Sequence, residues 1–238
     1  MPVFALTDEI AFPPPELAEG DGLLAVGGDL SPHRLVAAYR MGIFPWYSEG
    51  EPILWWSPSP RLVLSPHLFH LSKRLARTMR RGRFTVTMDT AFRRVVTACA
   101  HAPRKGQNGT WIVPEMVEAY CALHALGIAH SVECYAGPDL VGGLYGVALG
   151  HVFFGESMFS VLPDTSKISL AVLCRHLAAW NFTIIDCQMT TPHLVRLGAV
   201  EIDRTEFSAR LAHGLRHPHR PGPWSVSPTL MDRASASS

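Results

Sequence analysis

Residues 129–155 read AHSVECYAGPDLVGGLYGVALGHVFFG and carry the clearest local signal in the chain. Apolar and β-branched runs of strand length are interrupted there by turn residues, a pattern typical of consecutive β-strands. The predicted strands cover about 129–136, 140–148 and 151–155. The turn residues Gly137-Pro138-Asp139 join the first pair.

Helical patterns flank these strands on both sides. Pro114 opens a predicted helix that Gly127 stops, and a second predicted helix is capped by Ser166 and runs to Trp180. A short apolar strand at 183–185 then leads into Asp186. The order helix, strand, strand, strand, helix, strand indicates a mixed α and β fold, and periodicity alone says no more.

The first sixty residues are different, being rich in Pro, Gly and Trp. Ser31 is a suitable N-cap and Pro32 suits the first turn of a helix that ends at Gly42. Aromatic loops punctuated by proline follow, and such loops pack against a core or grip a ligand. From about residue 65 the pattern becomes regular.

Composition limits the classes of protein that fit. Apolar residues make up 47% of the 238 residues and charged residues 17%, which supports a packed core. The formal net charge is +1, so any nucleic-acid surface must be a local patch. We see neither a signal peptide nor an apolar run of about 18 residues, and expect a cytoplasmic protein without membrane contact. The five cysteines form no CxxC pair, and we expect them to be reduced core thiols.

Several short runs, in a fixed order, resemble one known family. They are Gly22-Leu23-Leu24-Ala25-Val26-Gly27-Gly28-Asp29-Leu30, Phe44-Pro45-Trp46, Trp55-Trp56-Ser57-Pro58, Gly109-Thr110-Trp111-Ile112, Val141-Gly142-Gly143-Leu144-Tyr145-Gly146, Gly155-Glu156-Ser157-Met158-Phe159-Ser160 and Ile185-Asp186-Cys187-Gln188. The chain thus looks like a leucyl/phenylalanyl-tRNA–protein transferase. The resemblance extends over nearly the whole chain, whereas any single run is weak.

The resemblance implies an α+β fold with two parts. It implies a small N-terminal domain, here residues 1–64, and a GNAT-like catalytic domain, here 65–238, in which helices flank a mixed sheet. It also implies the activity: transfer of Leu or Phe from aminoacyl-tRNA to the α-amino group of proteins that begin with Arg or Lys. Proteins so extended are marked for N-end-rule degradation.

Asp186 and Gln188 are the candidate catalytic residues. Residues two apart on an extended segment point to the same side, so the carboxylate could orient the amide and the amide could hold the incoming amine. The same residues could equally end a strand and cap a turn, but the family associates these positions with catalysis. A nucleophilic role for Cys187 is a weaker alternative.

Three further positions take roles from the resemblance. Glu156 lies amid apolar residues, where a carboxylate needs a partner or a function, and is assigned to acceptor binding. Trp46 and Trp111 match positions that stack on the terminal adenosine of tRNA. All three could instead be structural core residues.

The donor side chain needs an apolar pocket. The family positions for it are Leu144, Phe153, Leu170, Leu173, Leu177 and Ile185. Several members carry Met or Phe where this chain has Leu144, Leu173 and Leu177, which leaves the order of preference among Leu, Phe and Met open. Plain core packing is the alternative.

One dense basic cluster stands out. It comprises Lys73, Arg74, Arg77, Arg80 and Arg81, and no acid occurs from 62 to 88. On a predicted helix at about 73–81 most of these side chains share a face, and we expect contacts with the tRNA backbone.

Two other classes of protein remain as alternatives. One is a GNAT-like N-acetyltransferase using acetyl-CoA, although its glycine-rich pyrophosphate loop is not found. The other is a non-catalytic RNA-binding module, which leaves Glu156, Asp186 and Gln188 unexplained. We expect no cofactor and no metal, since His213, His217 and His219 lie in a proline-rich tail.

Overall fold

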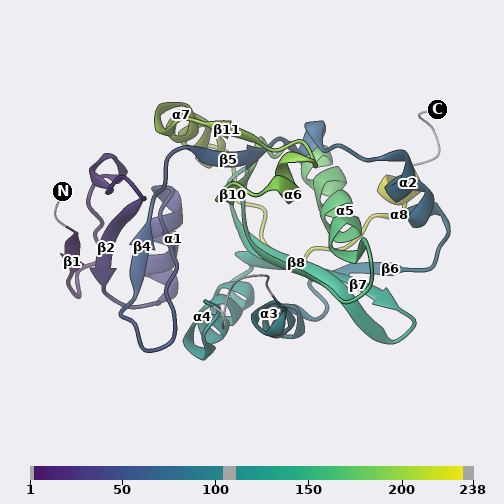
Figure 1. The fold of residues 1–238 in the computed structure, drawn as a ribbon, viewed down its shortest axis with the longest axis horizontal. Helices are drawn as coiled ribbons and strands as arrows, with labels where there is room; N and C mark the ends of the chain where they lie inside the picture. The colour runs from purple at the N-terminus through teal and green to yellow at the C-terminus, as the bar shows by residue number, and fades with distance from the viewer. Residues whose placement is uncertain (1–2, 104–110, 233–238) are drawn as a thin grey trace.

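The structure, a computed structural model, describes residues 3–103 and 111–232 (Figure 1). Within these ranges the chain forms two β-sheets with helices packed around them. Gly109 and Thr110, which belong to one of the runs quoted above, lie outside the described residues.

The smaller sheet belongs to the N-terminal part of the chain and has the strand order β1-β2-β4-β3. Its strands are β1 (Phe4–Leu6), β2 (Leu23–Gly27), β3 (Phe44–Pro45) and β4 (Leu54–Trp56). Its helix α1 (Pro32–Arg40) is the one predicted from sequence: the Ser31 hydroxyl accepts a hydrogen bond from the Arg34 amide, and Gly42 follows the helix with a φ of 71°. The buried face of α1 ends in Tyr39, which points toward the larger sheet's residues described below.

The larger sheet has the strand order β11-β5-β10-β9-β8-β7-β6. Its strands are β5 (Arg61–Leu64), β6 (Thr85–Met88), β7 (Ala129–Ala136), β8 (Asp139–Leu149), β9 (Val152–Ser160), β10 (Ile184–Gln188) and β11 (Val200–Ile202). The helices around it are α2 (Lys73–Arg80), α3 (Phe92–His101), α4 (Pro114–Ala125), α5 (Thr165–Ala179), α6 (Pro192–Val195), α7 (Arg204–Leu215) and α8 (Pro228–Asp232). Short 3-10 turns occur at Pro15–Leu17 and Pro66–Leu68.

The predicted order of elements is confirmed as α4, β7, β8, β9, α5, β10. β7, β8 and β9 pair antiparallel, and α5 then carries the chain across so that β10 lies parallel to β9. The α+β class and the mixed sheet flanked by helices are therefore as expected.

Details at element ends differ from the sequence prediction. β9 continues five residues beyond the predicted end at 155, because β8 remains beside it as a partner. The cap of α5 is Asp164 in a left-handed conformation with a φ of 70°, and Ser166 lies inside the helix. The sequence also predicts Asp89 as the cap of the helix that runs to about residue 100, but Asp89 does not cap α3, because its carboxylate accepts hydrogen bonds from the amides of Ser131 and Trp224 instead.

The domain boundary predicted after residue 64 falls at the end of β5. β5 pairs antiparallel with both β10 and β11, so a boundary at 64 would separate β5 from its own sheet. The smaller sheet ends with β4. We therefore propose a boundary between residues 56 and 61 in place of 64.

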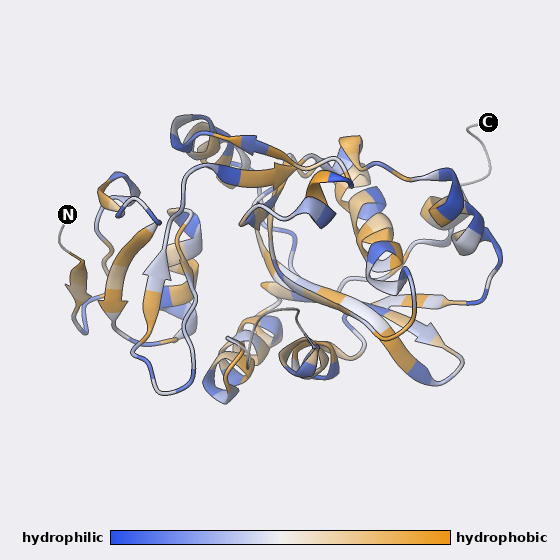
Figure 2. Ribbon diagram, viewed as in Figure 1, coloured by the Kyte–Doolittle hydropathy of each residue, from blue (hydrophilic) through white to orange (hydrophobic). Residues whose placement is uncertain are grey.

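The larger sheet separates two apolar layers. α3 and α4 lie on one side and α5 on the other (Figure 1). In Figure 2 the central strands and α5 carry much of the hydrophobic colour, whereas the surface around α2 is largely hydrophilic. Tyr39 and Trp55 of the N-terminal part pack into the same layer as α3 and α4, so the two parts of the chain share one core.

All five cysteines are free thiols. Across residues 3–103 and 111–232 we find no helix with the length and hydropathy needed to cross a bilayer. The same residues contain no cluster of three or more His, Cys, Asp or Glu side chains arranged to hold a metal ion.

Candidate active site

The strands β9 and β10 stop pairing where the candidate catalytic residues lie. Their parallel register ends with Asp186 opposite Phe154. Just beyond, each strand has a bulge against its other neighbour: Glu156 is the extra residue of β9 facing β8, and Cys187 is the extra residue of β10 facing β5. A bulge redirects side chains and is frequent beside active sites. The two bulges turn Glu156 and Gln188 toward each other.

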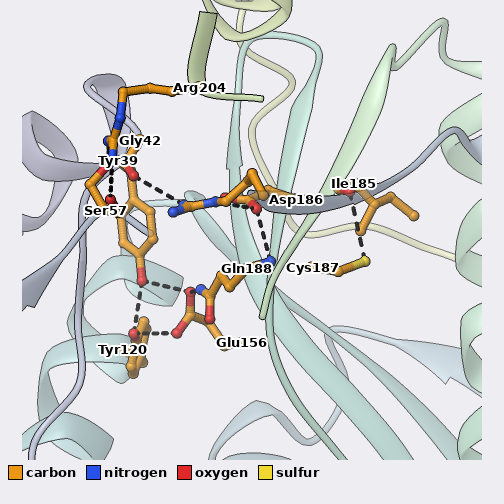
Figure 3. Close-up of polar contacts among 11 residues, drawn as sticks. Tyr39, Gly42, Ser57, Tyr120, Glu156, Ile185, Asp186, Cys187, Gln188 and Arg204 are labelled. Atoms are coloured by element: carbon orange, nitrogen blue, oxygen red, sulfur yellow. Dashed lines mark hydrogen bonds and ion pairs between the residues drawn. The ribbon is translucent and has the colours of Figure 1, made fainter. Parts of the chain in front are cut away.

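The Glu156 carboxylate is the centre of a hydrogen-bond network (Figure 3). Its Oε1 accepts hydrogen bonds from the Tyr39 hydroxyl at 2.7 Å and from the Gln188 Nε2 at 2.9 Å. Its Oε2 accepts one from the Tyr120 hydroxyl at 2.7 Å, and the two tyrosine oxygens are 2.8 Å apart. Three segments distant in sequence thus hold one carboxylate.

Burial raises the pKa of Glu156 from 4.5 to about 7. Hydrogen bonds from Tyr120, Tyr39 and Gln188 oppose this effect, and the nearby charge of Asp186 adds to it. The three short oxygen–oxygen contacts among Tyr39, Tyr120 and Glu156 need three protons, and the two tyrosine hydroxyls supply two. A protonated Glu156 would supply the third. The carboxyl group is poised to change charge near neutral pH.

Asp186 has a different environment. It is fully buried, and its carboxylate forms a two-pronged ion pair with Arg61, with Nε to Oδ1 at 2.8 Å and Nη2 to Oδ2 at 2.7 Å. Arg61 Nη2 also donates to the Gly42 carbonyl at 3.0 Å, and its guanidinium lies over the ring of Phe44. The charge of Asp186 is therefore matched by an equally buried cation.

The predicted contact between Asp186 and Gln188 exists, but through another atom. Asp186 Oδ1 accepts a hydrogen bond from the Gln188 backbone amide at 2.9 Å, not from its side chain. Gln188 has a φ of 62°, a conformation that needs such support in a residue with a side chain. Asp186 thereby holds the backbone, and the side-chain amide is held by Glu156.

Three residues of this arrangement were not singled out from the sequence. Tyr39 and Tyr120 each fall on the buried, apolar face of a helix, α1 and α4, where an aromatic residue is ordinary. Arg61 offered a signal, because it precedes the wholly apolar run Leu62-Val63-Leu64 on a buried strand. A cation there requires an acidic partner.

A cavity of about 500 Å³ opens beside Glu156 and Gln188. Five of the six predicted donor-pocket residues line it, namely Leu144, Phe153, Leu170, Leu173 and Ile185. Met158, Cys187 and Leu194 add further apolar wall. Leu177 is buried in the same apolar cluster but is not among the lining residues.

Cys187 faces this cavity together with Ile185, whereas Asp186 faces away from it. Burial raises the pKa of the Cys187 thiol well above its usual range, and the charge of Asp186 raises it further. The thiol therefore remains neutral, which does not favour the alternative of a cysteine nucleophile.

Trp46 and Trp111 are half-buried at the rim of the cavity. Both also line a neighbouring, wider cavity of about 990 Å³. Trp46 is steadied by Trp56, whose indole donates to the Trp46 carbonyl at 2.6 Å and whose ring centroid is 5.6 Å away. Trp46 and Trp111 thus belong to the walls of both cavities.

The basic cluster lies on α2 as predicted. Ser72 caps the helix, and all five predicted cations, Lys73, Arg74, Arg77, Arg80 and Arg81, are exposed. Although no acid lies near the cluster in the sequence, one lies near it in space: Arg74 Nη2 is 2.9 Å from Asp164 Oδ1. In Figure 1, α2 lies at the opposite end of the molecule from the smaller sheet.

Comparison with solved structures yields distant likenesses. A functionally unknown conserved protein from Staphylococcus epidermidis ATCC 12228 aligns with 10% identity over 76% of this chain and 68% of its own, with a TM-score of 0.40. A GCN5-related N-acetyltransferase from Kribbella flavida aligns with 11% identity over 71% and 60%, with a TM-score of 0.30.

Comparison of sequences is decisive. The family profiles that match the chain are those of an aminoacyl-transferring enzyme. Two family profiles match the chain: leucyl/phenylalanyl-tRNA protein transferase over residues 63–212, and the N-terminal domain of the same enzyme over 28–59. The leucyl/phenylalanyl-tRNA–protein transferases of Anaeromyxobacter sp. (strain Fw109-5) and Desulfatibacillum aliphaticivorans are each 58% identical over 226 residues, which is 95% of this chain and 96% and 97% of theirs.

The chain belongs to the leucyl/phenylalanyl-tRNA–protein transferase family. It is an aminoacyltransferase that moves Leu or Phe from tRNA to a protein N-terminus. The alternatives of an acetyl-CoA-dependent enzyme and of a non-catalytic RNA-binding module are set aside by this membership.

Proposed function

We propose that the acceptors are cytoplasmic proteins with N-terminal Arg or Lys, which this transfer marks for N-end-rule degradation, and that Met is a further donor. The observation that carries the proposal is the buried Glu156 carboxylate, hydrogen-bonded by Tyr39, Tyr120 and Gln188 at the wall of an apolar cavity. A carboxylate in an apolar wall can bind the cationic side chain of the acceptor's first residue.

The donor is an ester of an amino acid with the terminal ribose of tRNA. Its side chain would enter the cavity between Leu144, Phe153, Leu170, Leu173 and Ile185. The terminal adenine would stack on Trp46 or Trp111 at the rim, because a flat ring binds an unpaired base without reading a long sequence. The ester is already activated, so neither ATP nor a cofactor is needed.

The acceptor amine would attack the ester carbonyl beside Gln188. A carbon–nitrogen bond forms, the carbon–oxygen bond to the ribose breaks, and the ribose oxygen takes up a proton as the amine gives one up. Because Gln188 Nε2 donates to Glu156, the amide oxygen is left to accept an N–H of the amine. Alignment of this kind supplies much of the rate enhancement of an acyl transfer. Asp186 would act by holding the Gln188 backbone.

A direct assay tests the proposal. The protein is incubated without ATP with Leu-charged tRNA and a peptide that begins with Arg, and a Leu-Arg product is expected by mass spectrometry. The matched peptide beginning with Glu should remain unmodified, as should the Arg peptide when acetyl-CoA replaces tRNA. Equal extension of the Arg and Glu peptides would contradict the acceptor class and leave the family activity intact.

The pH dependence of peptide extension should show the titration of the Glu156 carboxyl group. Below about 7 this carboxyl gains a proton and loses the charge that attracts the acceptor. The acceptor amine also becomes protonated below roughly 7.7–8.0. For the wild type, log(kcat/KM) for the peptide should therefore fall with a slope approaching two on the acid side. In Glu156→Gln the activity should be lower at and above neutral pH, where the wild type carries the charge, and the acid-side slope should approach one. An unchanged slope would remove Glu156 from acceptor binding.

The basic helix α2 should contribute to the binding of full-length tRNA and not to the reaction of a short donor. Replacing Arg77 and Arg81 with Glu should weaken tRNA binding and reduce its salt dependence by roughly 0.7–0.9 in log–log slope per lost phosphate contact. Arg216→Glu, at an exposed site after α7, serves as the matched charge change. A short aminoacyl-adenosine donor should react normally with the α2 variant, and equal losses with both donors would argue against a tRNA surface on α2.

A further inference from the structure

The segment after α7, residues 217–227, forms a strap that contacts the turn at Gly127 and helix α5. Gly222 donates its amide to the Gly127 carbonyl at 3.1 Å, and Ser227 donates its amide to His176 Nε2 at 2.8 Å. The strap lies beyond residues 63–212, where the family profile matches. Its one large apolar side chain, Trp224, is only 4% exposed.

Trp224 is held rigidly at both its backbone and its ring. Its amide donates to Asp89 Oδ2 at 2.6 Å, and the same oxygen is 2.8 Å from His130 Nδ1. The indole ring stacks on the His130 imidazole, with centroids 3.6 Å apart and planes 3° from parallel. Trp180 meets it edge-on at 5.0 Å. An aromatic ring fixed on this many sides cannot yield to pressure from a neighbour.

That neighbour is Phe153, which lines the candidate donor cavity. The centroids of the Trp224 and Phe153 rings are 6.2 Å apart. On another side the Phe153 ring lies against Gly146, where an added Cβ would come within 2.6 Å of its edge atoms. Phe153 therefore has the Gly146 backbone and the Trp224 ring as neighbours, and it also lines the cavity.

We infer that Trp224 is a positioning residue for donor selection: by backing Phe153 it limits the depth of the cavity and so the relative use of Leu and Phe. This inference rests on the proposed donor cavity. A pocket that discriminates by shape depends on walls that do not move, because one methylene changes specificity by roughly 10- to 200-fold when the wall is firm. Trp224 supplies that firmness from outside the cavity.

The test compares kcat/KM for Phe-tRNA and Leu-tRNA with one Arg peptide. In Trp224→Leu the Phe153 ring gains room to retreat, and the Phe:Leu ratio should rise about tenfold, the low end of single-group effects in apolar pockets. Trp224→Phe should shift the ratio in the same direction by less, and serves if the first variant does not fold. Phe182→Leu is the matched control, because Phe182 packs on Trp224 within the same cluster and is not among the residues that line the cavity.

The outcomes separate the inference from the proposed function. Leu173→Phe narrows the cavity directly and should lower the Phe:Leu ratio. A shift at Leu173, with Trp224→Leu no different from Phe182→Leu, would overturn the role of Trp224 and leave the cavity assignment standing. No shift in any variant would overturn both. The inference is supported if the Phe:Leu ratio rises in Trp224→Leu and does not rise in Phe182→Leu, while the two variants have similar unfolding temperatures.

Discussion

Gln188→Ala should reduce turnover with an Arg-initiated peptide by at least about 100-fold, the low end for a positioned hydrogen-bonding group in proton transfer. The reason is geometric. Gln188 is the only side chain in the described residues that bridges β10 to Glu156, through the 2.9 Å bond from its Nε2. Without the amide, the acceptor loses a partner for its N–H and Glu156 loses a donor. Steady-state kinetics with Leu-tRNA in excess measures the effect.

Binding of Leu-tRNA should change little in this variant, because the tryptophans and apolar wall that would hold the donor remain. Thr190→Ala is the matched control: this exposed residue lies two positions along the chain, its hydroxyl donates to Glu201, and it is not among the residues that line the cavity. Near-normal peptide turnover in Gln188→Ala, or an equal loss in the control, would remove the amide from the mechanism.

Arg61→Met should lower the free energy of unfolding by about 3–5 kcal/mol, the usual cost of leaving one charge of a buried ion pair without its partner. Asp186 would be left fully buried with no cation beside it. Asp186→Asn should have a similar cost, because the Arg61 guanidinium is buried to the same extent. Denaturant unfolding of each variant measures these losses.

The double variant Arg61→Met, Asp186→Leu separates stability from activity. Removing both charges should restore most of the lost stability, since apolar replacements of a buried pair are often neutral or better. Peptide turnover should remain low, because the Gln188 amide has lost the Asp186 acceptor that supports its left-handed backbone. Recovery of activity together with stability would show that Asp186 serves the fold alone.

Arg204→Met is the comparison for Arg61→Met, because Arg204 is hydrogen-bonded to neutral groups and not to a carboxylate. Arg204 donates to the hydroxyl and carbonyl of Ser57. Its removal leaves no carboxylate without a cation, so the loss should be smaller, about 1.5–3 kcal/mol, the usual net contribution of hydrogen bonding by a charged group. A loss as large as that of Arg61→Met would show that size, not charge, governs the first result.

Local chemistry explains which elements were predictable. The Ser31 cap of α1, the Pro114 start of α4 and the glycine after each of these helices depend on neighbours in the chain, and all three were predicted from sequence. The caps of α3 and α5 were not. Asp89 has the right side chain for a cap, but Ser131 and Trp224 compete for it, and both come from distant segments.

The family, the order of elements in the core and the residue types at Glu156, Asp186 and Gln188 can be read from short runs and from periodicity along the chain. The contacts among those three residues cannot, because they depend on how distant segments pack. Two bulges and a pairing register place Gln188 against Glu156 and turn Asp186 away toward Arg61. Bulges and register are set by which strands become neighbours, and that is fixed by the packing of the whole core, including a tyrosine from the N-terminal part, and not by any local run of residues.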